Sequence, residues 1–204
     1  IEDKDNAAVI QLGLGVVYES QGDYAKSMAM YQAALERWRQ TDNIIWLANL
    51  LNNLGVLQHI TGDYKSAMLS YEQALQYAHR SGYTRIEAFI ITGIGDIYVE
   101  LNALDEAFSA YQQARSTAER LHLNTLLVYL SIQEAVVASG RGNLPESYRL
   151  IEQAQAIANR ESLLMESHLC SLEYGGLKVK EGKPGEVTTL LEKACLFFES
   201  GGHK

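Results

Sequence analysis

The chain of 204 residues carries a formal net charge of -8, with 47% hydrophobic and 21% charged residues. This composition excludes a disordered chain, and the scattered Lys and Arg argue against any direct contact with nucleic acid, which needs clustered positive charge. No 18-residue apolar run or signal peptide is present, so we expect a cytoplasmic protein that does not enter a membrane. Two prolines among many Ala, Leu, Gln and Glu residues favour an all-α fold.

Turn signals recur every 40 residues along the chain. They are Gly22-Asp23-Tyr24, Gly62-Asp63-Tyr64, Asn102-Ala103-Leu104, Gly142-Asn143-Leu144 and Gly182-Lys183-Pro184. A second class of turn lies near 41–43, 81–83, 121–124 and 161–162. In chain order, we predict first helices near 5–20, 44–60, 84–100, 124–140 and 163–181, and second helices near 24–40, 64–80, 104–120, 144–160 and 184–199.

The starts of the second helices carry their own signals. Asp23 and Asp63 follow the turn glycines, where a carboxylate can accept hydrogen bonds from free backbone N–H groups. Pro145 and Pro184 fall where a first helical turn is expected, a position at which a missing N–H is harmless.

Small residues recur at one phase of the 40-residue period and large residues at another. The small positions of the first helices are Gly15, Gly55, Gly95, Ala135 and Gly175, and the large positions of the second helices are Tyr31, Tyr71, Tyr111, Ile151 and Leu191. A glycine inside a helix costs about 1 kcal/mol relative to Ala, so its recurrence indicates that two helices pack closely there. Gly13 and Gly93 lie in the same helices without the strand of a dinucleotide loop, and we interpret them as packing glycines too.

The second unit carries a recognisable pattern: Leu54-Gly55, then Gly62-Asp63-Tyr64, Ala67, Tyr71 and Ala74-Leu75. This pattern resembles the tetratricopeptide repeat (TPR) signature, and the resemblance extends over essentially the whole chain. It implies a right-handed α-α superhelix of five antiparallel helix pairs, with repeats at about 4–43, 44–83, 84–123, 124–163 and 164–204. The period exceeds the standard 34 residues. It is similar to the lengthened repeats of large bacterial transcriptional activators of the maltose-activator and LuxR type.

The resemblance also implies that the first helix of each pair lines a concave groove. Carried over by position, the expected ligand contacts are Leu12, Val16, Asn49, Asn52, Val56, His59, Phe89, Thr92, Asp96, Tyr129 and Ile132. This mixed surface lacks the Lys, Arg and Asn clamp with which some TPR domains hold a C-terminal carboxylate, so that ligand is disfavoured.

Asn52 and Asn53 form the most pointed local feature of this set. Each side-chain amide both donates and accepts hydrogen bonds, and can therefore pair with the backbone of an extended peptide of any sequence. The run Leu51-Asn52-Asn53-Leu54 resembles that of peptide-binding TPRs. The alternative is that both are solvated or interhelical residues.

Candidates for chemistry are few. We expect Cys170 and Cys195, both within predicted helices, to be buried free thiols. His168 and Cys170 are two residues apart, do not share a helix face and lack further ligands, so we expect no metal. No catalytic or cofactor motif is present, and we therefore predict a protein that is not an enzyme and binds no cofactor.

The last predicted helix is unusually apolar, with Leu196, Phe197 and Phe198 at phases that are mostly polar in earlier repeats. Repeat arrays usually end in a polar cap, so this helix predicts either further repeats or self-association. Gly201-Gly202 falls at the phase between repeats, and we expect the chain to be a fragment of a longer protein.

These observations favour a scaffold that binds a protein or peptide, as the sensor or interaction region of a bacterial transcriptional regulator. One alternative is a domain that senses a small-molecule inducer. Another is an assembly scaffold unrelated to transcription.

Overall fold

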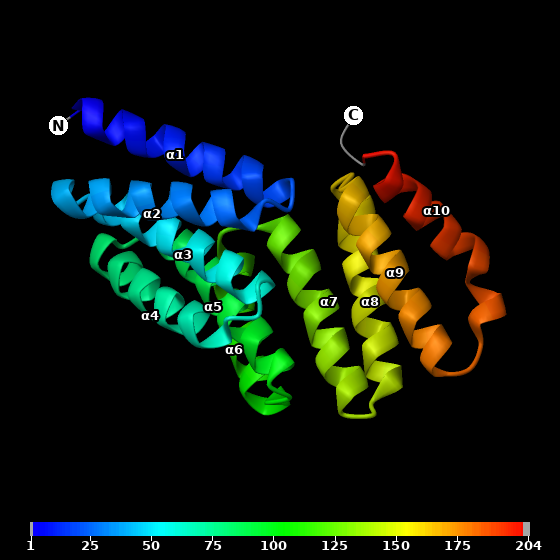
Figure 1. Cartoon of the computed structure of the whole chain (residues 1–204). Coiled ribbons are helices and arrows are strands. Elements are labelled where there is room, and N and C mark those ends of the chain that lie inside the picture. The colour runs from blue at the N-terminus through cyan, green and yellow to red at the C-terminus, as the bar shows by residue number, and fades with distance from the viewer. Residues whose placement is uncertain (1, 202–204) are drawn as a thin grey trace. The chain divides into compact units, whose positions relative to one another are not determined.

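The computed structural model describes residues 2–201, and the side chains from Asp5 onward. These residues form ten α-helices, one short 3-10 helix and no strand, which confirms the all-α prediction (Figure 1). The elements are α1 Glu2–Ser20, α2 Tyr24–Thr41, α3 Ile44–Ile60, α4 Tyr64–Ser81, α5 Thr84–Glu100, α6 Leu104–Arg120, α7 Asn124–Gly140, α8 Leu144–Arg160, α9 Leu164–Lys180, η1 Pro184–Glu186 and α10 Thr188–Glu199.

The chain divides between Leu101 and Asn102 into two compact units. In unit 1, α1 packs on α2 and α3 on α4, while α5 contacts both α3 and α4. In unit 2, α7 packs between α6 and α8, and α9 contacts α7, α8 and α10. No helix among residues 2–201 is long and apolar enough to cross a membrane.

The turns confirm the predicted 40-residue period and both predicted classes of turn. Residues with positive φ recur every 20 positions, at Gly22, Asp42, Gly62, Gly82, Asn102, His122, Gly142, Ser162 and Gly182. This left-handed backbone ends one helix and lets the chain reverse into the next. Four of these residues are not glycine, but Asn and Asp tolerate this conformation better than most side chains.

The predicted starts of the second helices are confirmed with one correction. The side chains of Asp23 and Asp63 accept hydrogen bonds from the backbone N–H groups of Lys26 and Ser66, and Pro145 lies in the first turn of α8. Pro184 instead begins the short helix η1, and α10 starts only at Thr188. The last α-helix is therefore shorter than predicted.

The glycine positions confirm the predicted close approach of paired helices. A methyl group on Gly15 would overlap the ring of Tyr31, and one on Gly175 would overlap the side chain of Leu191. Gly93 packs in the same way against the ring of Tyr71. The prediction for Gly13 was wrong: it is exposed, and a methyl group there would meet no described atom within 4 Å.

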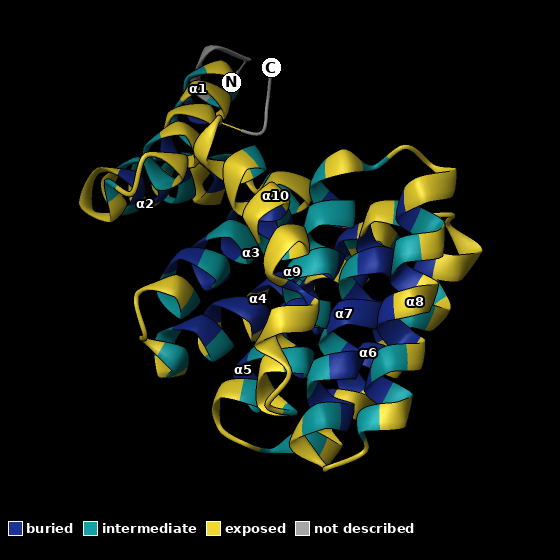
Figure 2. Cartoon of the chain, turned by 90° about the vertical axis from the view of Figure 1, so that its right-hand side faces the viewer, coloured by how far each residue is buried: buried dark blue, intermediate teal, exposed yellow. Residues whose placement is uncertain are grey.

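Each unit has its own core. In unit 1, Tyr31, Trp38 and Tyr71 are the largest fully buried side chains, and Trp38 stacks on Trp46 with 5.2 Å between ring centroids. In unit 2, a core cluster forms around Val128, Ile151 and residues of α9. Figure 2 shows the contrast between the largely buried α7 and the largely exposed α10, in which Ala194 is the buried residue.

Candidate binding surfaces

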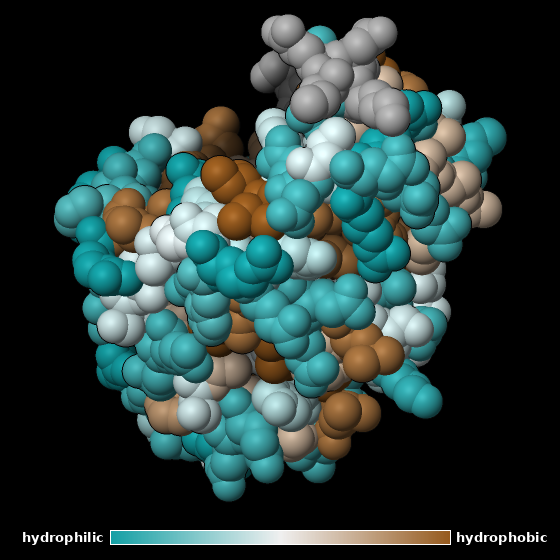
Figure 3. Space-filling view, turned by 90° about the vertical axis from the view of Figure 1, so that its left-hand side faces the viewer, coloured by the Kyte–Doolittle hydropathy of each residue, from teal (hydrophilic) through white to brown (hydrophobic). Residues whose placement is uncertain are grey.

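The first helices of unit 1 carry most of the residues predicted to contact a ligand. Val16 on α1 and Phe89 on α5 are exposed at 47% and 37%. Thr92 is buried. The half-buried members of the set in unit 1 are Leu12, Asn49, Asn52, Val56, His59 and Asp96. Apolar side chains thus reach the surface among hydrophilic ones, as Figure 3 shows for one face of the molecule.

Asn52 on α3 has hydrogen-bonding capacity that the rest of the described chain leaves unused. Its Nδ2 donates to Oδ1 of Asn53 over 3.5 Å, which is a long and weak hydrogen bond. Its Oδ1 is buried and accepts no hydrogen bond from any described residue. A buried polar atom without a partner is costly, so rotation of this amide toward a ligand would relieve that cost.

Other predicted ligand contacts of unit 1 already interact with residues of the same unit. Nδ2 of Asn49 donates to the carbonyl oxygen of Ile45 over 2.9 Å, and Oγ1 of Thr92 donates to the carbonyl oxygen of Ala88 over 2.8 Å. His59 lies against the ring of Tyr64, with 5.6 Å between centroids. Leu12 and Val56 pack partly against the unit 1 core.

Two predicted contacts lie on α7 of unit 2. Tyr129 is half-buried, whereas Ile132 is 8% exposed and belongs to the core cluster of that unit. Exposure therefore divides the predicted set, and Val16, Phe89 and the half-buried polar residues are the more accessible members.

Glu19 places a carboxyl group beside the packed tyrosines of unit 1. The hydroxyl of Tyr31 donates to Oε2 of Glu19 over 2.9 Å. Burial raises the pKa of Glu19, and this hydrogen bond partly offsets the rise. Burial also raises the pKa of Tyr71, with smaller contributions from the charges of Asp96 and Glu19.

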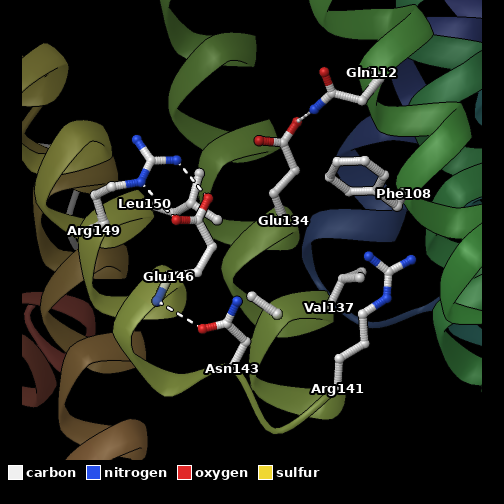
Figure 4. A pocket seen from close by; sticks show the side chains of 10 residues that line it. Phe108, Gln112, Glu134, Val137, Arg141, Asn143, Glu146, Arg149 and Leu150 are labelled. Atoms are coloured by element: carbon white, nitrogen blue, oxygen red, sulfur yellow. Dashed lines mark hydrogen bonds and ion pairs between the residues drawn. The ribbon is translucent and has the colours of Figure 1, made fainter.

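Unit 2 contains a cleft of about 430 Å³ between α6, α7 and α8, which is the size class of small ligand pockets (Figure 4). Phe108, Val137 and Leu150 supply apolar walls. The other lining residues are Gln112, Glu134, Ala138, Arg141, Asn143, Glu146 and Arg149.

The charged groups of the cleft are paired within the protein. Arg115 donates to both carboxylate oxygens of Glu134, at 2.9 and 2.7 Å, and Gln112 donates to the same carboxylate at 2.9 Å. Arg149 pairs with Glu146. Arg141 pairs with Asp105 and lies over the ring of Phe108, 5.1 Å from its centroid.

The Arg115 and Glu134 pair was missed by the sequence analysis. Glu134 is 3% exposed and stands where the earlier repeats have Leu54 and Ile94, while Arg115 stands where they have Leu35 and Leu75. The sequence contained a signal for this pair, because two consecutive helices each carry a charged residue, of opposite sign, where the earlier repeats have an apolar one.

The last helix shows the predicted apolar surface. Leu196 and Phe198 are exposed at 64% and 37%, and Phe197 stacks on His168 with 4.1 Å between centroids. Cys170 is buried as predicted, but the prediction for Cys195 was wrong, because that thiol is exposed on α10. The described residues contain no cluster of His, Cys, Asp and Glu that could hold a metal ion.

The sequence profile of the MalT-like TPR region matches residues 2–174. The chain belongs to this TPR family. No curated protein matches the sequence. The family assignment confirms the resemblance drawn from the repeat signature and its lengthened period.

Solved structures share the TPR fold at low sequence identity. BtubC from P. vanneervenii is 19% identical, with a TM-score of 0.70 over 94% of this chain and 79% of that one. A Rap protein complexed with Competence and Sporulation Factor is 15% identical, with a TM-score of 0.82 over 92% of this chain and 53% of that one. The Rap conjugation gene regulator of plasmid pLS20, in complex with the Phr* peptide, is 14% identical, with a TM-score of 0.82 over 95% and 53%. This TPR chain spans about half the length of both Rap proteins.

Proposed function

We propose that this TPR chain binds a protein or peptide partner through the first helices, as the sensor or interaction region of a bacterial transcriptional regulator. The observation that carries the proposal is the uncommitted amide of Asn52 on α3, whose Oδ1 lacks a partner among the described residues. An extended peptide backbone offers N–H groups, from which this oxygen can accept hydrogen bonds. Phe89, on the neighbouring α5, adds exposed aromatic surface of the kind that anchors partners.

The similar structures support this choice. Two Rap proteins with the same fold were solved with a bound factor or peptide. The transcriptional setting rests on the MalT-like family. The two free thiols suit a reducing compartment, so we place the protein in the cytoplasm. We propose a binding protein without catalytic activity; a turnover abolished by one surface substitution would overturn that part.

The test is selection of a random peptide library on the immobilised chain, followed by fluorescence anisotropy with the selected peptides. Asn52→Ala and Phe89→Ala should each weaken binding at least tenfold. Gln73→Ala and Leu69→Ala change exposed residues on α4 and should leave binding unchanged. Equal affinity of all four variants and the unaltered chain would refute the assignment to the first helices.

The small-molecule alternative makes a different prediction. A thermal-shift screen of sugars and other metabolites should find no compound that raises the melting temperature at modest concentration. A tight ligand at a hundredfold excess over its Kd would add about 2.7 kcal/mol of stability, and such a result would favour an inducer-sensing domain instead.

The remaining expectations extend the proposal. We propose that residues 1–204 are one array of five repeats from a longer protein, without direct contact to nucleic acid. Self-association through Leu196 and Phe198 stays a prediction. Analytical ultracentrifugation of the chain and of a Phe198→Glu variant over a concentration series tests it. The average molar mass should rise with concentration for the unaltered chain and stay constant for the variant.

A further inference from the structure

At one register position near the end of the first helices, the size of the side chain differs between the repeats. Repeats one, two, three and five have Tyr18, Gln58, Tyr98 and Lys178 there, and repeat four has Ala138. Ala138 is 8% exposed and lines the cleft of unit 2. The cleft therefore lies where the other repeats carry a long side chain.

The long side chains at this position interact with neighbouring elements. Nζ of Lys178 lies 3.1 Å from Oε2 of Glu186 and 5.3 Å from the ring centroid of Tyr148 on α8. Gln58 shares a hydrogen bond of 2.7 Å with the hydroxyl of Ser70 on α4. A long side chain at this position thus contacts the element that follows its helix, in unit 1 and in unit 2 alike.

Two residues that line the cleft with Ala138 correspond by register to the two residues that contact Lys178. Phe108 stands at the register position of Tyr148, and Glu146 stands at that of Glu186. Both line the cleft, whose volume of about 430 Å³ exceeds what one side chain needs. An aromatic ring or an ammonium group from outside the chain could enter it.

The charges of the cleft decide between these two groups. Arg141 already occupies the face of Phe108, 5.1 Å from the ring centroid, and Arg149 already pairs with Glu146. A further cation in the cleft would meet both guanidinium groups, and like charges repel. A neutral ring would instead bury apolar surface on Val137 and Leu150 and can stack on a guanidinium plane.

We propose that the cleft between α6, α7 and α8 binds an aromatic side chain of a protein partner, in the space that Ala138 leaves open. Tyr18 and Tyr98 show that the register position itself accepts an aromatic residue. Aromatic anchors that fill such pockets often dominate the energetics of protein interfaces. This site is separate from the first-helix contacts and does not depend on their ligand.

The test is an amide ¹H–¹⁵N NMR titration of the whole chain with N-acetyl-L-tyrosinamide. Saturable shifts should appear at the residues that line the cleft, with a Kd of about 1–10 mM, as expected for a ligand of this size. Ala138→Gln, which copies Gln58, should weaken binding at least tenfold. Ala138→Tyr, which copies Tyr98, is the second filling variant and should do the same.

Two controls accompany the titration. Ala156→Gln adds the same side chain at an exposed position of α8 and should not change binding. N-acetyl-L-lysinamide should produce no saturable shifts at the cleft. The proposal is overturned if tyrosinamide shifts no cleft residue, if both filling variants bind it as the unaltered chain does, or if lysinamide binds equally well.

Discussion

Gly55 of α3 packs directly against the ring of Tyr71 on α4, so closely that a methyl group on Gly55 would lie 2.5 Å from Cε1 of that ring. Tyr71 is 1% exposed, and Gly93 of α5 lies against the same ring. The ring of Tyr71 on α4 is therefore packed closely against both α3 and α5. This contact is the repeated element that holds neighbouring helices together.

Gly55→Ala is expected to destabilise the protein by about 2 kcal/mol. Overpacking against Tyr71 outweighs the gain of up to about 1 kcal/mol that Ala gives a helix. Gly13→Ala is the matched substitution in an open position of α1 and should stabilise by about 0.5–1 kcal/mol. Urea unfolding followed by circular dichroism measures both, and a stabilised Gly55→Ala variant would contradict the packing argument.

The Arg115 and Glu134 pair should be costly to break and easy to replace. Arg115→Ala leaves a carboxylate that is 3% exposed without its main partner, so we expect a loss of about 3 kcal/mol. Replacing both residues by Leu restores the residue types found at this register in unit 1, and should bring stability back to the original value or above it. Thermal unfolding of the single and double variants checks this. A double variant no more stable than Arg115→Ala would show that the site requires charge.

The two thiols should differ in reactivity. Burial raises the pKa of the Cys170 thiol to about 12, and only the thiolate reacts with disulfide reagents. Titration of the native chain with Ellman's reagent at pH 8 should therefore modify one thiol quickly, and denaturant should expose the second. Cys195→Ser should abolish the fast phase and Cys170→Ser should leave it intact; the reverse assignment would contradict the placement of α10.

Glu19 should make unit 1 less stable as pH rises. Because burial raises its folded pKa above the ordinary value of 4.5, the folded state holds the proton more tightly than the unfolded state. The stability that this carboxyl contributes is present below pH 4.5 and is lost as pH rises through its folded pKa. Glu19→Gln removes this dependence.

The measurement is the difference in melting temperature between Glu19→Gln and the unaltered chain at pH 4 and at pH 7. Other carboxyl groups titrate equally in both proteins, so the difference isolates Glu19. It should shift in favour of the variant at pH 7. A difference that does not change with pH would mean that Glu19 is as well solvated as in the unfolded chain.

The sequence by itself determined the repeat. Helices, turns and the packing of Gly15 or Gly55 on the next tyrosine were predictable, because each depends on local backbone preference and on contacts that recur every 40 residues. The residues that the repeat does not determine were harder. Gly13 and Cys195 were assigned to the interior, although their surroundings leave them exposed.

Only the tertiary structure decided what each departure from the repeat does. Ala138 is an ordinary helix residue in the sequence, and its meaning comes from the volume that its neighbours on α6 and α8 leave unfilled. Glu134 looks like an exposed charge until α6 brings Arg115 within 2.7 Å of it. Burial, cavities and ion pairs are set by side chains from different helices, and a pattern along one helix does not contain that information.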